Sequence, residues 1–249
     1  MATSFGALCT DFYINQKLAL KMDLPSQRET VLDLFDRIRR AEPHMDQFRR
    51  FEGELALESV AKEGAYDWVA LRRTSVRSGT VNPESLASAY KIHRMVLEIT
   101  PYFLSVSPLD IDYVELMFGF DLEAKGNHDE IVCDALFSES PLGRLVDHDR
   151  TTTLDAQPFF TYALDEKRKL QVNFEVKTRT SERELAEDKY DDEPISVFMS
   201  LRRLGPIDQV DDLQTIFESL SSEAERIAAD RVVPYLINPI TKAISSRSC

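Results

Sequence analysis

The strongest constraint in this sequence is a pair of landmarks that occurs twice in the same order. The first copy runs from Leu71-Arg72-Arg73 through a long helical pattern to Pro101-Tyr102, and the second runs from Leu201-Arg202-Arg203 to Pro234-Tyr235. The landmarks are offset by 130 and 133 residues. Segments that stay in step over this distance indicate an internal duplication, which limits the fold to architectures that can be built twice.

An earlier pair of matching segments extends the repeat toward the N-terminus. Residues 22–24 match residues 120–122 at an offset of 98, and residues 26–29 match residues 127–130 at an offset of 101. Offsets that grow along the chain indicate an insertion of about thirty residues in the second copy. We place it mainly at residues 181–193, which we expect to be an exposed, mobile loop because seven acidic residues stand there against two basic ones.

Each copy contains the pattern of a strand, a helix, further strands and a long helix. Residues 13–23 and 115–121 alternate between apolar and polar side chains, which is typical of a strand with one wet face. Ser26, Asn82 and Asn127 are the expected helix N-caps. The further strands are expected at residues 51–58, 68–77, 159–164, 170–178 and 194–203.

We therefore expect an α+β fold in which a mostly antiparallel sheet is covered on one face by helices. The first repeat would span residues 10–107 and the second residues 108–240, together forming one pseudo-symmetric unit, with a tail at residues 241–249. This layout resembles duplicated α+β folds such as that of the TATA-binding protein, and each half is similar to the chaperones of type III secretion. The resemblance is one of topology and implies no function.

Net charge indicates the class of partner, and cysteine content indicates the cellular compartment. The 249 residues carry a formal net charge of −13, which argues against nucleic acid or an anionic membrane as a partner. Cys9, Cys133 and Cys249 are too few and too far apart for a disulfide framework, as is typical of a reducing cytosol. With no signal peptide or membrane span in the sequence, we expect a cytoplasmic protein.

Motifs for common enzymes are absent from the sequence. It contains no Gly-rich phosphate loop and no G-x-S-x-G nucleophile elbow. His93 stands among apolar helical residues and is expected to be a buried core histidine. One metal-site alternative remains, formed by His128, Asp147 and His148, whose side chains suit Zn²⁺ or Mn²⁺. The same residues equally suit a helix cap and a polar loop.

Basic residues on the wet face of the sheet are the expected ligand-binding residues. Arg72 and Arg202, paired by the duplication, would lie on this face together with Lys17 and Lys177. Guanidinium groups there could hold an anionic or peptide ligand. The other interpretation, which we favour, is that they form cross-strand pairs with Glu115, Asp121 and Glu175.

These observations favour a non-catalytic binding or protein-interaction module, chaperone-like or self-associating, without a cofactor. The polar sheet face or an exposed strand edge would contact a protein partner or a second copy of the chain. Two alternatives stay open. One is a metal-dependent hydrolase using His128, Asp147 and His148, and the other is a small-molecule sensor with a pocket between sheet and helices.

Overall fold

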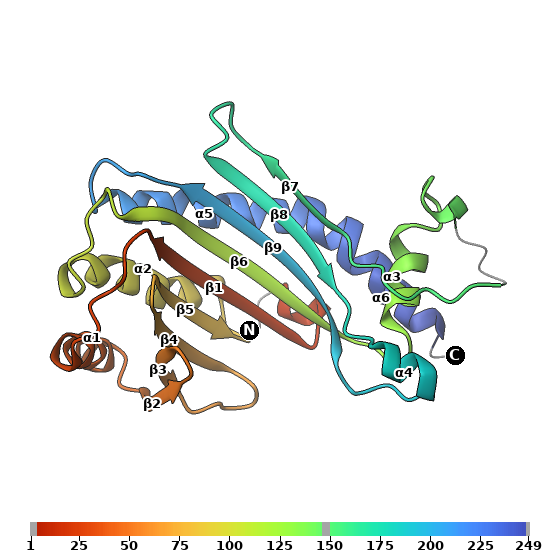
Figure 1. The fold of residues 1–249 in the computed structure, drawn as a ribbon, viewed down its shortest axis with the longest axis horizontal. Helices are drawn as coiled ribbons and strands as arrows, with labels where there is room; N and C mark the ends of the chain where they lie inside the picture. Colours follow the sequence, from red (N-terminus) through yellow and green to blue (C-terminus); the bar gives the residue numbers. More distant parts are fainter. Residues whose placement is uncertain (1–3, 146–149, 248–249) are drawn as a thin grey trace.

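Nine antiparallel strands form one sheet in the order β2-β3-β4-β5-β1-β6-β9-β8-β7 (Figure 1). This computed structural model describes residues 4–145 and 150–247. Its α+β class and antiparallel sheet confirm the prediction from the sequence. The strands are β1 (Asp11–Leu20), β2 (Met45–Phe51), β3 (Glu54–Ser59), β4 (Tyr66–Arg72), β5 (Ser75–Val81), β6 (Ile111–Glu123), β7 (Phe159–Ala163), β8 (Leu170–Lys177) and β9 (Pro194–Leu204).

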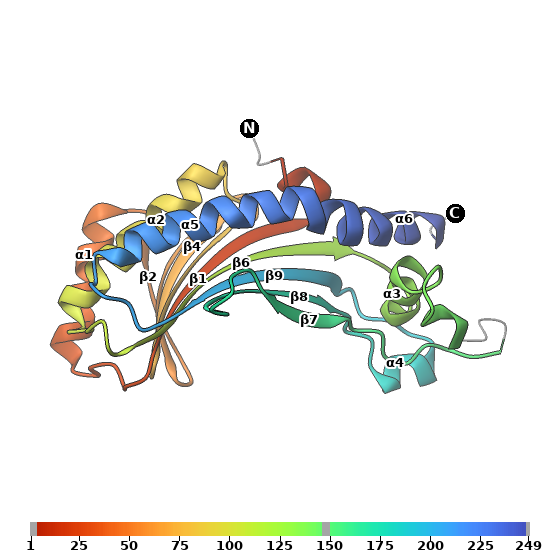
Figure 2. The same cartoon turned by 90° about the horizontal axis from the view of Figure 1, so that it is seen from above.

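The longer helices lie on one face of this sheet, so its other face is left open, as expected (Figure 2). α2 and α5 cross the covered face, and a π-helical segment, η3, continues α5 into α6. α3 and α4 lie at one end of the sheet. The helices are α1 (Arg28–Ala41), α2 (Leu86–Phe103), α3 (His128–Leu136), α4 (Glu182–Glu187), α5 (Asp212–Ile227), η3 (Ala228–Ile237) and α6 (Asn238–Arg247), with short 3₁₀ turns at Gly6–Leu8 and Gly143–Leu145.

The centre of the sheet is the antiparallel pair β1 and β6, which is in register from Asp11 opposite Asp121 to Ala19 opposite Tyr113, with a shift before Leu20 opposite Ile111. From β1 outward follow β5, β4, β3 and β2, and from β6 outward follow β9, β8 and β7. The first strand of the chain therefore lies in the middle of the sheet, between neighbours that come from two different parts of the sequence.

Alternation of side chains along each strand builds the core. In β1, Phe12, Ile14 and Leu18 are fully buried against the helices, while Tyr13 and Lys17 point to the open face. This is the period-two pattern expected for a sheet with one wet face. The apolar side chains of sheet and helices form one continuous cluster across the molecule, so the space between them is filled by core.

The structure confirms one of the three N-caps predicted from the sequence. Asn127 caps α3 as predicted, since its Oδ1 accepts from the backbone N–H of Asp129 at 3.0 Å. The other two predicted caps are wrong. α1 starts after Gln27 without a side-chain cap, and α2 starts after Ser85. The side chain of Asn82 instead bonds β1, accepting from the Phe12 N–H at 2.9 Å, and this tertiary contact prevails over capping.

Turns divide two of the predicted strands. Residues 51–58 contain the last residue of β2, a tight turn and most of β3, because Gly53 has a φ of +70° and lies in the turn between these strands. Residues 68–77 likewise divide into β4 and β5 at Arg73-Thr74. Pro101 lies near the end of α2, as expected, whereas the helix continues past Pro234 through η3 into α6.

The acidic stretch and the tail are more ordered than expected. Residues 181–193 contain the short helix α4, where Ser181 and Glu184 form a reciprocal capping box. Backbone and hydroxyl donors there lower the pKa of Glu184 to about 2. The expected tail is helical as far as Arg247, which forms ion pairs with Glu130 (3.2 Å) and Asp134 of α3.

The two Leu-Arg-Arg landmarks occupy different places in the sheet. The first ends β4, which is separated from β1 by β5, whereas the second lies in β9, directly beside β6. Arg72 and Arg202 therefore do not occupy equivalent positions about the β1–β6 pair. The duplication itself, with its boundaries at residues 10–107 and 108–240, stays a prediction.

Candidate functional site

A line of charged side chains crosses the open face at the centre of the sheet. Arg77 of β5 lies opposite Lys17 of β1, Lys17 lies opposite Glu115 of β6, and Glu115 lies opposite Arg202 of β9. We call these four residues the central row. Directly opposite side chains in an antiparallel sheet are about 5 Å apart. The row therefore brings three cations and one carboxylate together from four strands.

Tyr113 of β6 holds two of these cations in place. Lys17 donates from Nζ to the Tyr113 hydroxyl at 2.6 Å, and its Nζ lies 5.0 Å from the centre of the ring. The Arg202 guanidinium carbon lies 4.2 Å from the same ring centre. A cation near an aromatic face is attracted by the ring quadrupole, so a single tyrosine orients both side chains over the sheet.

The two predicted arginines form cross-strand ion pairs. Arg202 donates from Nε (2.9 Å) and Nη2 (2.5 Å) to Glu115 Oε2. Arg72 forms an ion pair with Glu54 of β3. The structure thus shows the cross-strand pairing that the sequence favoured, with Glu115 as an expected partner and Glu54 as an unexpected one. It brings Lys17 and Arg202 together but places Arg72 in β4, away from Arg202.

Arg77 is the residue of this row that the sequence analysis missed. The carboxylates whose charges reach it, Glu54 and Glu115, are already engaged by Arg72 and Arg202. Among the described residues, no carboxylate forms an ion pair with Arg77, and its Nε is buried without an acceptor. Burial lowers the pKa of Arg77, as does the nearby charge of Arg72. The one signal in the sequence was its polar position in a period-two strand.

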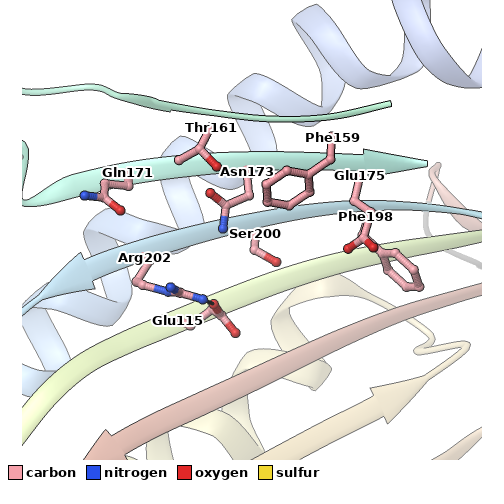
Figure 3. A pocket seen from close by; sticks show the side chains of 9 residues that line it. All are labelled: Glu115, Phe159, Thr161, Gln171, Asn173, Glu175, Phe198, Ser200 and Arg202. Atoms are coloured by element: carbon pink, nitrogen blue, oxygen red, sulfur yellow. Dashed lines mark hydrogen bonds and ion pairs between the residues drawn. The ribbon is translucent and has the colours of Figure 1, made fainter. Parts of the chain in front are cut away.

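A hollow of about 370 Å³ adjoins the central row on its β9 side (Figure 3). Its walls combine the aromatic rings of Phe159 and Phe198 with amide and hydroxyl side chains that can both donate and accept hydrogen bonds. The residues that line it are Glu115, Phe159, Thr161, Gln171, Asn173, Glu175, Phe198, Ser200 and Arg202. The fourth predicted residue, Lys177, is exposed opposite Ser196 and takes no part in this hollow.

Two glycines next to β1 let aromatic rings lie flat on the sheet. A Cβ added to Gly79 would come within 2.2 Å of the Trp68 ring, and a Cβ added to Gly119 would come within 2.2 Å of the Tyr13 ring. The rings therefore occupy the space that a side chain would take. The two rings cover the backbone of β5 and of β6, the strands on either side of β1.

The described residues do not form the metal site that the sequence left open as an alternative. His128 is buried, with its Nε2 3.3 Å from the carbonyl oxygen of Ala124. Asp147 and His148 lie outside the described residues. Within 4–145 and 150–247, no group of three or more His, Cys, Asp or Glu residues is placed to hold a metal ion. The metal site therefore stays a prediction.

The buried carboxylate of Asp129, next to His128, is engaged in hydrogen bonds within the fold. One of its carboxylate oxygens accepts from the Ala156 N–H at 2.8 Å and from the Thr178 hydroxyl at 2.6 Å. It thereby joins α3 to the end of β8 and to the segment before β7.

Comparisons with known proteins give no family for this chain. No family model matches it, and no curated protein matches it. A rolling circle replication initiator protein from Geobacillus stearothermophilus aligns over 88% of this chain and 83% of its own, with 8% identity and a TM-score of 0.26. The di-domain ARO/CYC BexL from the BE-7585A biosynthetic pathway aligns over 93% and 98%, with 6% identity and a TM-score of 0.18. Scores this low establish no shared fold.

In the part of the chain that the structure describes, no helix combines the length and the apolar character needed to cross a bilayer.

Proposed function

We propose that this chain is a non-catalytic binding module whose open sheet face holds an extended, acidic segment of a protein partner. The observation that supports this most is Arg77. It is a half-buried guanidinium, flanked by Lys17 and Arg72 and unpaired among the described residues. A charge removed from water is costly without a partner. A carboxylate of the ligand supplies that partner, in the bidentate geometry that arginine favours.

The hollow beside the row suits a peptide backbone. Gln171, Asn173 and Ser200 offer donors and acceptors to peptide groups, and the two phenylalanine rings offer apolar contact. Glu115 and Glu175 line the same hollow and would repel any anionic group placed there, whether carboxylate or phosphate. A peptide can place a carboxylate at Arg77 and neutral peptide groups in the hollow, whereas a nucleic acid carries a phosphate at every nucleotide.

Fluorescence anisotropy with a short labelled peptide of alternating glutamate and threonine tests this proposal. We expect binding that weakens as salt is added, because exposed charges are screened. The same peptide with lysine in place of glutamate is expected not to bind. A single-stranded DNA probe that binds more tightly than the glutamate peptide would overturn the assignment to a protein ligand.

Arg77→Gln is the decisive variant. A hydrogen bond to a charged group contributes about 1.5–3 kcal/mol, so affinity for the glutamate peptide should fall roughly ten- to a hundredfold. Arg39→Gln is the matched control, because Arg39 lies in α1, away from the open face, where it pairs with Asp36 at 2.9 Å. Equal losses in both variants would show that only net charge matters and would refute the site.

A further inference from the structure

The two edges of the sheet differ in how they are protected. The edge strand β2 carries three charged residues, Asp46, Arg49 and Arg50, and charges on an edge discourage pairing with another strand. The opposite edge strand β7, Phe159–Ala163, has neither a charge nor a proline, and all five of its residues are exposed. Only the β7 edge is therefore free to accept a further strand.

The hydrogen bonds of β7 show which of its backbone groups are free. Val176 donates to the carbonyl oxygen of Pro158 at 3.0 Å, and Leu164 donates to that of Leu170 at 2.8 Å. Backbone groups alternate in direction along an antiparallel strand. The backbone N–H and C=O groups of the even-numbered residues of β7 therefore point toward β8. Those of Phe159, Thr161 and Ala163 point away from the sheet.

We propose that β7 pairs antiparallel with β7 of a second copy of this chain, about a twofold axis at Thr161. This register places Phe159 opposite Ala163 of the second copy and Thr161 opposite itself, so roughly six backbone hydrogen bonds can form. Because both copies use the same edge in such an isologous contact, the assembly stops at a dimer. The sheet then continues across both molecules, and their open faces point the same way.

Side chains on the helix side of β7 support the same pairing. Phe160 and Tyr162 are half exposed, because η3 does not cover the edge, and both rings lie against Phe174 at 5.3 and 5.8 Å between centroids. They line a groove of about 480 Å³ whose other walls are Leu164, Phe174, Arg226, Ile227, Arg231, Tyr235 and Leu236. In the proposed register Phe160 lies opposite Tyr162 of the second copy. Two such aromatic cross-strand pairs would cover the groove.

Charges at the two ends of β7 fix the direction of pairing. The turn after β7, residues 165–169, contains Asp165 and Glu166 as well as three basic residues, and the exposed Asp155 precedes the strand. In the antiparallel register Lys167 of one copy lies opposite Asp155 of the other. Parallel pairing would instead bring Lys167 beside the Lys167 of the second copy, and like charges across an interface are unfavourable. The occupant that best fits this edge is therefore a second copy.

Sedimentation velocity of the full chain over a range of concentrations tests the interface. We expect a monomer–dimer equilibrium and at least a tenfold weaker association for Thr161→Pro. That change removes an outward N–H, and an edge strand tolerates proline at such a position. Thr161→Ala keeps the N–H and should associate like the unchanged chain. A monomer at every concentration, or a dimer that Thr161→Pro leaves intact, would overturn the proposal.

Charge reversal provides a second test that leaves the strand itself unchanged. Lys167→Glu and Asp155→Lys should each weaken the dimer, and the double variant should recover much of the association. Both residues are exposed, so folding is expected to be unaffected. This test decides the matter if circular dichroism shows that Thr161→Pro is unfolded. A double variant no stronger than either single variant would contradict the proposed register, whether or not the open face binds acidic peptides.

Discussion

His93 links the stability of the fold to pH through its burial. It is fully buried in α2, with its Nδ1 2.8 Å from the hydroxyl of Ser78 in β5. Burial lowers the pKa of His93 to about 3, well below the value of about 6.5 for a histidine in an unfolded chain. Between these two values the unfolded chain binds a proton that the folded chain does not.

The free energy of unfolding should therefore fall as the pH drops below about 6.5. Each pH unit in this window costs about 1.4 kcal/mol through His93 alone. Urea unfolding from neutral pH to about pH 4 is expected to show a flatter pH dependence for His93→Gln than for the unchanged chain. His44→Gln is the control, since His44 is exposed beside Asp67, and it should keep the steeper dependence. Parallel curves for the unchanged chain and His93→Gln would contradict the assignment.

The two residues with the clearest environments differ in how far the sequence could predict them. The burial of His93 follows from its apolar helical neighbours such as Val96 and Leu97, which share its face. Arg77 could not be recognised in this way, because its surroundings come from strands distant in sequence. Its neighbours Lys17 and Glu54 are brought beside it only by the pairing of β5 with β1 and of β3 with β4.

At the scale of single strands, aromatic rings that lie over glycines join β4 to β5 and β1 to β6 on the open face. The ring of Trp68 covers Gly79 of β5, and the ring of Tyr13 covers Gly119 of β6. Each contact joins neighbouring strands and needs a residue without a side chain beneath the ring. Replacing either glycine should therefore disturb one pair of strands and leave the other unchanged.

Gly79→Ala should lower the free energy of unfolding by about 1–3 kcal/mol, as overpacking usually does. Because Trp68 is the only tryptophan, its emission should shift to longer wavelength as the ring is displaced toward water. Gly119→Ala should cost similar stability without changing Trp68 emission, since its new methyl group meets Tyr13. Unchanged emission in Gly79→Ala would show that the indole does not rest on this glycine.

The strands were easier to predict than their ends and their order. Period-two alternation identified β1, β6 and β8, because each has one face buried and one face wet. The turns at Gly53 and at Arg73-Thr74 were missed, since strand-forming residues continue on both sides. Strand order depends on contacts between distant segments, which no local pattern encodes.

For the whole molecule, the continuous core implies that the chain unfolds as one unit. The apolar cluster includes residues from β1 through α6 without a break. The two predicted repeats meet along the full length of β1 and β6 rather than through a loop. Neither half has a complete core of its own, so we expect a single cooperative transition.

This expectation is checked with one probe in each half. Trp68 reports on β4, and Phe198→Trp in a Trp68→Phe background reports on β9. Midpoints of thermal unfolding from the two probes and from far-ultraviolet circular dichroism should coincide. Separate midpoints would indicate that residues 10–107 and 108–240 unfold independently.

The central position of β1 also has a consequence for synthesis of the chain. β1 can pair with β5 once Val81 has left the ribosome, but its other side stays open until β6, Ile111–Glu123, has been made. During that interval the nascent polypeptide exposes one unpaired edge of β1, the strand that carries Phe12, Ile14 and Leu18. Neighbouring ribosomes on one message would then carry chains able to pair with one another. Translation that stalls between Val81 and Ile111 would release an aggregation-prone fragment rather than a smaller folded domain.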